Sequence, residues 1–161
     1  MDEINRVEHA YALWVLARPG AVPAQYLLQY EPRWKGWLFP YIKLGGEDVT
    51  TNTYEEGLPF MLEVLLGIQA NDISCHYIAE RNLEKYSIPH AEMREYIHRL
   101  FRIEIRNGSD LLLQDEFELN HRSYKWMSFE EMKADEAIWA MNGDVISWAE
   151  EQLCQSTREE N

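Results

Sequence analysis

The sequence is poor in cysteine, with only Cys75 and Cys154 among 161 residues. The two thiols lie far apart and have neither a metal-binding nor a redox spacing, which argues against a cysteine-based metal site or redox motif. Cysteines that remain reduced are typical of a reducing compartment. We therefore expect a cytoplasmic protein.

The chain also lacks long apolar runs. None approaches the roughly 20 residues that are needed to cross a bilayer. The N-terminal segment, residues 1–6, is acidic and has no apolar core of the kind found in signal peptides. We expect no membrane among the partners of this chain.

Positive charge is scarce. The chain has 15 Lys and Arg residues against 28 Asp and Glu residues, which gives a formal net charge of −13. Non-specific binding to DNA or RNA requires Lys and Arg side chains opposite the phosphates, so this charge argues against it. A small anionic ligand in a local basic pocket remains compatible with the composition.

The chain has the size and composition of a globular protein. Hydrophobic residues make up 46% of the sequence, and six Trp and nine Tyr residues are present. This composition predicts a folded core with large aromatic rings, and it suggests an aromatic-lined pocket. We expect one domain over residues 1–161, with a core over about residues 8–153 and a polar tail over residues 155–161.

The most informative stretch is residues 45–68, where a loop that opens with two adjacent glycines leads into an apolar segment. Thr53 and Glu56 have the spacing of a capping box, in which the two side chains satisfy free backbone N–H groups at a helix start. Residues 58–66 are apolar except at one position. Gly67 suits the left-handed residue that ends many helices. The pattern predicts a helix that is covered on most of its sides.

This stretch resembles the signature segment of the Nudix superfamily. When Gly46 is placed at the first signature position, Gly67 falls on the last glycine and Ile68 on the apolar residue after it. Leu62 then occupies the inner apolar position. Residues 34–40 are similar to the Trp-rich approach that precedes the signature. The resemblance implies an α/β (α+β) fold, namely a Nudix-like α/β/α sandwich with a mixed sheet.

Every charged position of the signature differs in this chain. The loop glutamate is replaced by Asn52, the Arg-Glu pair by Phe60 and Met61, and the Glu-Glu pair by Val64 and Leu65. In the family, the helix glutamates hold magnesium or manganese against a diphosphate. Magnesium needs oxygen ligands, which these side chains do not offer. The resemblance therefore implies a catalytically inactive pseudoenzyme with no catalytic residue, no metal and no cofactor.

The alternative is an atypical hydrolase of nucleoside-diphosphate-linked compounds that depends on a divalent metal such as Mg²⁺. Its candidate catalytic residues are Glu56 and Glu63. Further carboxylates that could help to hold the ion lie in the signature loop and in an acidic cluster after residue 114: Glu47, Asp48, Glu55, Asp115, Glu116 and Glu118. For the acidic cluster, a solvated turn is the favoured interpretation.

Apolar patterning predicts four strands outside the signature. They cover residues 10–17, 24–30, 74–80 and 96–106. The polar residues 81–95 predict a loop with a short edge strand at 84–88.

Turn and capping residues predict the rest of the chain. Asn107 and Gly108 predict a hairpin turn, which leads to a partner strand over residues 110–114. Ser128 and Glu131 have the spacing of a second capping box.

A retained Nudix-like cleft would bind a nucleotide-like small molecule, with rings stacked on a base and cations on phosphates. The resemblance places these wall residues in the cleft: Trp37, Lys43, Arg99, Arg102 and Trp126. In some purine-binding relatives an Asn just before the last helix contacts the base. Asn142 occupies the matching place, although a helix N-cap is its simplest role. The five histidines are expected to be ordinary surface or core residues.

A protein-interaction module is the other interpretation. Phe60, Met61, Val64 and Leu65 would then form a patch for a protein partner or for a second copy of the chain. The favoured alternative is that these side chains face the core of their own molecule.

Overall fold

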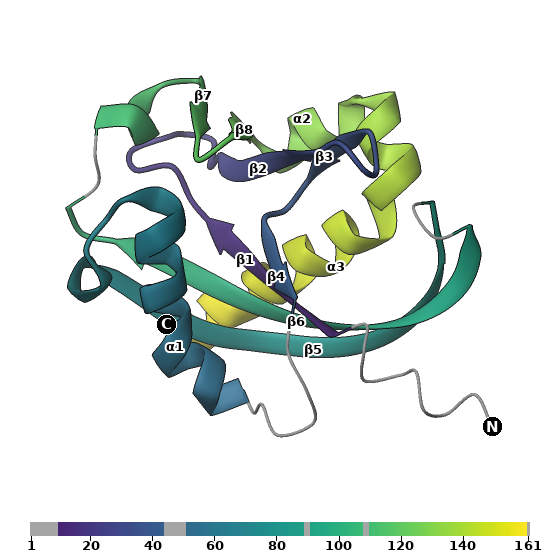
Figure 1. Ribbon diagram of the computed structural model, residues 1–161, viewed down its shortest axis with the longest axis horizontal. Helices are drawn as coiled ribbons and strands as arrows, with labels where there is room; N and C mark the ends of the chain where they lie inside the picture. The colour runs from purple at the N-terminus through teal and green to yellow at the C-terminus, as the bar shows by residue number, and fades with distance from the viewer. Residues whose placement is uncertain (1–9, 44–50, 89–90, 108–109, 161) are drawn as a thin grey trace.

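The computed structural model describes residues 10–43, 51–88, 91–107 and 110–160. Two four-stranded sheets and three helices make up this part of the chain (Figure 1). The strands are β1 (Ala10–Leu16), β2 (Tyr26–Glu31), β3 (Gly36–Leu38), β4 (Tyr41–Lys43), β5 (Ile73–Ser87), β6 (Glu92–Ile105), β7 (Glu116–Leu119) and β8 (Arg122–Met127). The helices are α1 (Thr51–Leu66), α2 (Phe129–Ala134) and α3 (Glu136–Glu160), with short 3₁₀ turns at Ala70–Asp72 and Asp110–Leu113.

The first sheet is mixed and has the strand order β4-β1-β6-β5. β1 and β6 are parallel, with Leu13 opposite Leu100, whereas β4 and β5 run antiparallel to their neighbours. The second sheet has the order β3-β2-β8-β7 and is antiparallel throughout. The predicted α/β sandwich with a mixed sheet is confirmed.

Strand β1 is buried on both faces and therefore separates two hydrophobic clusters. Trp14 belongs to the cluster that contains the leucines of α1, while Val15 belongs to the cluster that contains the apolar residues of α3. Successive side chains of a strand point to opposite faces, so a nearly continuous apolar run is what a strand covered on both faces requires. This explains why residues 10–17 were predicted correctly.

Helix α1 packs one face on the first sheet. Its buried residues Leu58, Leu62 and Leu66 recur every four positions, as expected for the inner face of a helix. The predicted end is confirmed, because Gly67 follows the helix with φ +69°. The predicted start at Thr53 is wrong by two residues, since the helix already includes Thr51. The loop residues Gly45, Gly46, Glu47 and Asp48 lie outside the described residues.

The largest error of the sequence analysis concerns residues 81–95, which were predicted to be mainly loop. They belong instead to a long hairpin in which β5 continues to Ser87 and β6 begins at Glu92. Among the described residues, β6 pairs with β1 from Ile97 to Ile103, so residues 92–96 of β6 extend past the described part of β1 (Figure 1). A strand that projects in this way needs few apolar residues, and its polar composition concealed it.

Three further predictions on local structure are corrected. Residues 110–114 form a 3₁₀ turn rather than a strand, because the antiparallel partner of β6 is β5. The acidic segment predicted as a solvated turn contributes β7, where Phe117 is buried and stacks on Tyr124 at 5.3 Å between ring centroids. The helix α3 includes residues 155–160, which were predicted to be a frayed tail.

The second capping box is confirmed. Ser128 Oγ accepts a hydrogen bond from the backbone N–H of Glu131 at 3.1 Å, and the Glu131 carboxylate accepts one from the backbone N–H of Ser128 at 3.0 Å. The hydrogen bond from the Ser128 backbone is the main reason why the pKa of Glu131 is lowered. The box starts α2, which leads into α3. Within the described residues, no helix is long and apolar enough to cross a membrane.

Candidate ligand-binding cavity

A cavity of about 240 Å³ lies between the first sheet, strands β2 and β3 of the second sheet, and α3. Its floor is apolar and consists of Leu13, Leu28, Phe39, Ile138, Val145 and Ile146. Five aromatic side chains form its walls: Tyr11, Trp34, Trp37, Tyr41 and Tyr96. Its remaining lining residues include Arg33, Lys43, Ser87, Arg94, His98 and Asn142.

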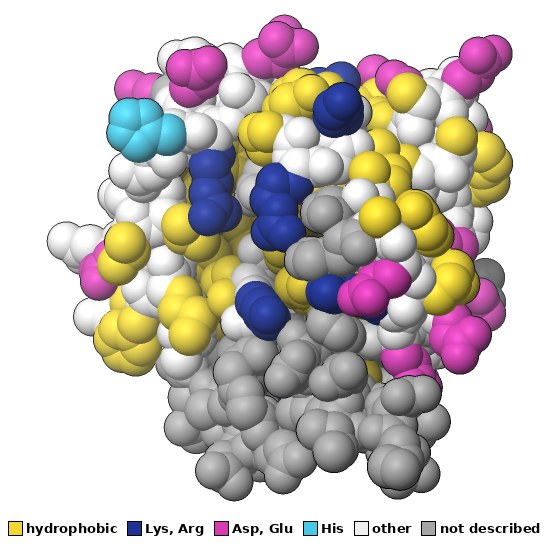
Figure 2. Space-filling model, turned by 45° about the vertical axis from the view of Figure 1, so that its right-hand side comes forward, with side chains coloured by type: hydrophobic (Ala, Val, Ile, Leu, Met, Phe, Trp, Pro, Cys, Tyr) yellow, Lys and Arg dark blue, Asp and Glu magenta, His cyan; other side chains and the backbone are white. Residues whose placement is uncertain are grey.

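The charge of this lining is opposite to that of the chain. Three cationic side chains line the cavity, and no Asp or Glu is among its described lining residues, in a chain that carries 28 acidic residues. On the face shown in Figure 2, Lys and Arg side chains gather around an apolar hollow, and most Asp and Glu side chains lie toward the edges. The arrangement favours an anionic ligand at this place.

The tyrosines of the wall hold one another in position. The ring of Tyr11 contacts the edge of Tyr41 at 5.4 Å between centroids and lies 5.8 Å from Tyr96. Burial is the main reason why the pKa of Tyr11 is raised, while the nearby guanidinium groups of Arg33 and Arg94 oppose that rise. Both arginines line the same cavity as Tyr11.

Glu31 connects two residues that line the cavity, Arg33 and Tyr41. Its carboxylate accepts one hydrogen bond from the hydroxyl of Tyr41 and one from the backbone N–H of Arg33, each at 3.0 Å. Burial, followed by the charge of Glu31, raises the pKa of Tyr41. The tyrosine therefore stays neutral at physiological pH and acts as a donor. The two bonds tie the turn that carries Arg33 to strand β4.

The wall at β3 depends on close packing against α3. The ring of Trp37 lies under Lys125, whose Nζ is 4.4 Å from the ring centroid. At Gly36 an added Cβ would come within 2.7 Å of Cε of Met141, so the flexible end of that side chain would have to move to make room for it. Asn142 follows Met141, has non-helical angles (φ −134°, ψ 17°), and donates from Nδ2 to the backbone oxygen of Trp37 at 3.5 Å.

The predicted N-cap role of Asn142 is thus only partly correct. Helix α3 begins at Glu136, so Asn142 is not at its first turn but at a kink within it. This kink directs Asn142 to the cavity. The structure brings three of the residues predicted for ligand binding to the cavity, namely Trp37, Lys43 and Asn142.

The other three predicted ligand residues lie elsewhere. Arg99 pairs in register with Ala12 and hence points to the α1 face of the sheet, where it contacts Glu80 at 2.5 Å. Arg102 lies beyond the cavity on β6, 3.6 Å from Glu104.

Trp126 is the last of these three. It is buried in the cluster beneath α1, with the guanidinium of Arg18 5.9 Å from its ring centroid. Its position in the second sheet turns it away from the cavity toward that cluster.

Several cavity residues were missed. Arg94 lies in residues 81–95, which were predicted mainly as a loop. Tyr96 and His98 lie in the predicted strand 96–106 but were not assigned to the site. The alternation of Arg94, Tyr96 and His98 at every second position is the one sequence signal that could have placed them on a single face. Arg33 and Trp34 lie in the turn between β2 and β3 and carry no such signal.

Helix α1 does not contribute to this cavity through any of its described side chains. The prediction that its substituted positions face the molecule's own core is wrong for three residues. Phe60 is 64% exposed, Met61 43% and Val64 75%. Only Leu65 is partly buried and packs against the cluster. The inner face is already taken by the leucines at positions 58, 62 and 66.

The carboxylate of Glu63 in α1 makes a hydrogen bond that connects the helix to the turn after it. Glu63 Oε1 accepts a hydrogen bond from the backbone N–H of Ala70 at 3.1 Å, which ties the helix to the following turn. Asn120 adds a second tie, since its Nδ2 donates to the backbone oxygens of Val64 and Leu65 at 3.0 and 2.8 Å. Both contacts stabilise the helix end.

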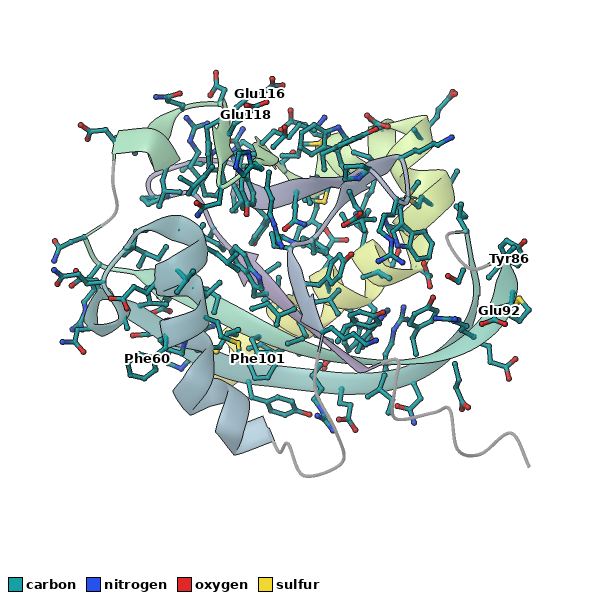
Figure 3. The ribbon with its side chains drawn as sticks, in the orientation of Figure 1. Phe60, Tyr86, Glu92, Phe101, Glu116 and Glu118 are labelled. Carbon is teal, nitrogen blue, oxygen red and sulfur yellow. The ribbon has the colours of Figure 1, made fainter. Side chains whose placement is uncertain are left out.

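The described carboxylates of the alternative metal site are dispersed, while Glu47, Asp48 and the side chain of Glu55 lie outside the described residues. Asp115 pairs with Arg18 at 2.9 Å. Glu116 and Glu118 lie on β7, well away from Phe60 of α1 (Figure 3). Among the described residues, no group of three or more His, Cys, Asp or Glu side chains is placed to hold a metal ion. The side chain of Glu56 lies outside that described set.

The fold is the one found in Nudix hydrolases. Two solved structures of C. elegans Ap4A hydrolase resemble this chain. The first has a TM-score of 0.53 and 16% identity over 86% of this chain and 93% of the hydrolase. The second, a binary complex, has a TM-score of 0.55 and 17% identity over 90% of this chain and 98% of the hydrolase. No family model and no curated protein sequence matches the chain.

Proposed function

We propose that this chain is a Nudix-like binding module that holds a nucleotide-like small molecule and does not hydrolyse it. The observation that supports this proposal is the lining of the cavity, which combines aromatic rings with three cations and, among its described residues, no carboxylate. Aromatic rings stack on bases, and guanidinium groups bind phosphates in a bidentate manner. Arg94 also pairs with Glu92 at 2.6 Å, so a bound phosphate would share this guanidinium with a carboxylate.

Each wall has a separate role in the proposed complex. The rings of Trp34 and Trp37 stack on the base, and Asn142 contacts its edge from the kink of α3. Arg33 and Arg94, which line the same cavity as Tyr11, bind the phosphate. The fold neighbours act on a dinucleotide, as their name Ap4A hydrolase states, and this analogy supports a nucleotide as the chemical class.

The volume of the cavity limits the ligand. A cavity of about 240 Å³ is just below the roughly 300–1,000 Å³ of typical small-molecule sites. We therefore expect one nucleoside unit with its phosphates at the mouth, rather than two nucleosides.

The substituted signature positions of α1 support the proposed lack of hydrolysis. Phe60, Met61 and Val64 provide no oxygen ligands for a hard cation. The carboxylate of Glu63 already accepts a backbone hydrogen bond from the turn after the helix. The proposed module therefore binds its ligand without a divalent metal.

Isothermal titration with nucleoside mono- and diphosphates, in EDTA and again with Mg²⁺, tests the proposal. We expect a saturable heat with at least one of them, of similar size with and without Mg²⁺, and no released phosphate. Replacing Trp37 by Leu should weaken the binding at least tenfold, because one stacked ring contributes about 1–3 kcal/mol. No binding of any nucleotide would refute the proposal. Mg²⁺-dependent turnover that Glu63→Gln abolishes would establish the hydrolase instead.

A further inference from the structure

Glu92 lies in one row with the residues of β6 that line the cavity. Side chains at every second position of a strand share a face, so Glu92 is on the same face of β6 as Arg94, Tyr96 and His98. The last three line the cavity, and Glu92 continues their row toward the end of the hairpin, where Figure 3 shows it. A carboxylate therefore lies next to one of the three cations of the cavity.

The carboxylate of Glu92 is in direct contact with that cation. Arg94 Nε donates a hydrogen bond to Glu92 Oε1 at 2.6 Å, and the two side chains are 19% and 55% exposed. Hydrogen bonds between two ionised groups are short and strong. Arg94 thus has an anionic partner before any ligand arrives, and a phosphate that binds there meets the charge of Glu92.

Glu31 also contacts residues of the cavity, but through uncharged donors. Its carboxylate accepts from the hydroxyl of Tyr41 and from the backbone N–H of Arg33. These bonds hold the wall in place, whereas the bond of Glu92 is made to a guanidinium that lines the cavity. Glu92 is therefore the carboxylate whose removal should change the charge of the site and leave the wall intact.

We propose that Glu92 is a specificity-determining residue, which competes with the phosphate of the ligand for Arg94 and so lowers the affinity for highly charged phosphate groups. This inference rests on the proposed nucleotide site. A terminal phosphate carries about −1.5 to −2 charges at pH 7, whereas its methyl ester carries a single charge and a nucleoside carries none. Repulsion grows with the charge of the ligand. Glu92 thus reduces the advantage that the three cations give to a terminal phosphate over a phosphodiester.

Isothermal titration of the native chain and of Glu92→Gln tests this role. The probes are adenosine, adenosine monophosphate and the methyl ester of that nucleotide, with the guanosine series in parallel. We expect Glu92→Gln to raise the affinity for the monophosphate about threefold, which is the scale of a partly exposed ion pair. The gain should be smaller for the methyl ester and absent for the nucleoside. An equal gain for all three compounds would mean that the shape of the cavity has changed, and would refute the proposal.

Glu80→Gln is the matched control. Glu80 pairs with Arg99 of the same strand at 2.5 Å, and Arg99 is 20% exposed, close to the 19% of Arg94. The substitution removes the same charge on the other face of the sheet, and it should leave every affinity within about twofold because the solvent screens distant charges. A gain equal to that of Glu92→Gln would show an effect of net charge alone and would refute the competition.

Glu92→Ala distinguishes competition from positioning. Alanine removes the hydrogen-bond acceptor as well as the charge, so competition predicts a gain for the monophosphate at least as large as that of Glu92→Gln. A weaker affinity would show that Glu92 holds Arg94 in place, and would refute the proposal.

The same titrations separate this inference from the proposed function. If the native chain binds the nucleotides and Glu92→Gln leaves their affinities unchanged or lowers them, only the role of Glu92 fails. If neither protein binds any of the nucleotides, the nucleotide site fails with it.

Discussion

The two faces of the first sheet have become very different surfaces, although the same strand supplies both. On the α3 face, Tyr11 and Leu13 of β1 border a cavity with cationic and aromatic walls. On the α1 face, Trp14 lies in a filled core, and the exposed side chains of α1 include the apolar Phe60, Met61 and Val64. The comparison shows that the proposed ligand cavity and the described side chains of α1 lie apart in this chain. In the Nudix signature, by contrast, the helix carries the charges that act on the ligand.

The largest expected effect is on stability, and it comes from comparing a substitution on the buried side of α1 with one on its exposed side. Leu62→Ala removes a fully buried side chain and should lower the free energy of unfolding by about 2–5 kcal/mol. Val64→Ala, two positions away on the exposed side, should change it by less than about 0.5 kcal/mol. Urea unfolding of the dilute proteins measures both values. Equal losses would mean that Val64 is buried like Leu62, against its 75% exposure.

The next prediction contrasts the two faces of β6. Arg94 and Arg99 lie on the same strand, are 19% and 20% exposed, and each pairs with one glutamate, at 2.6 Å and 2.5 Å. Only Arg94 lines the cavity. Arg94→Gln should weaken nucleotide binding by about tenfold or more, since a hydrogen bond to a charged group contributes about 1.5–3 kcal/mol.

Arg99→Gln is the matched control for that experiment and should leave the affinity within about twofold, because removing its exposed ion pair changes little. Isothermal titration in EDTA gives both affinities. The reverse ranking would place the ligand on the α1 face and would restore the assignment that the sequence suggested.

A smaller effect on stability is expected where Gly36 of β3 packs against Met141 of α3. Gly36→Ala forces the Met141 side chain to move, because its Cε lies 2.7 Å from the added Cβ. Because the contact is with the flexible end of a methionine, we expect a loss of at most about 1 kcal/mol in stability. Since Asn142 and Trp37 border this contact, a drop in nucleotide affinity should accompany the loss. Loss of stability with unchanged affinity would show that the kink does not position the cavity wall.

The smallest effect concerns pH. Burial and Glu31 raise the pKa of Tyr41 above its ordinary value of 10.0 in the folded state. The folded chain therefore holds this proton more tightly than the unfolded chain. The resulting stabilisation is complete below pH 10.0 and is lost as the pH rises toward the higher folded value. Thermal unfolding should show a steeper decline above about pH 10 in the native chain than in Tyr41→Phe. Parallel declines would contradict a raised pKa.

The sequence predicted those features that depend on local chemistry. The end of α1 at Gly67 and the capping box of Ser128 and Glu131 each need only a few neighbouring residues, and both were placed correctly. Strand β1 was found because burial on both faces demands an apolar run. The fold class followed from the spacing of the signature, although its charges are absent.

The remaining features depend on contacts between distant segments. The choice between Arg94 and Arg99 rests on the register of β6 against β1 and on which face holds the cavity, and neither is encoded locally. Trp126 was misplaced for the same reason. Phe60 and Val64 were expected in the core because they are apolar, but the leucines of α1 fill that role and rotate them outward.

The distribution of the tryptophans has a practical consequence for the study of this chain. Trp34 and Trp37 border the cavity, whereas Trp14 and Trp126 are enclosed in the cluster on the opposite face. A stacked base would quench the emission of the first pair and leave that of the second pair constant. The protein thus contains its own fluorescent reporter of occupancy, with an internal reference, and needs no attached dye.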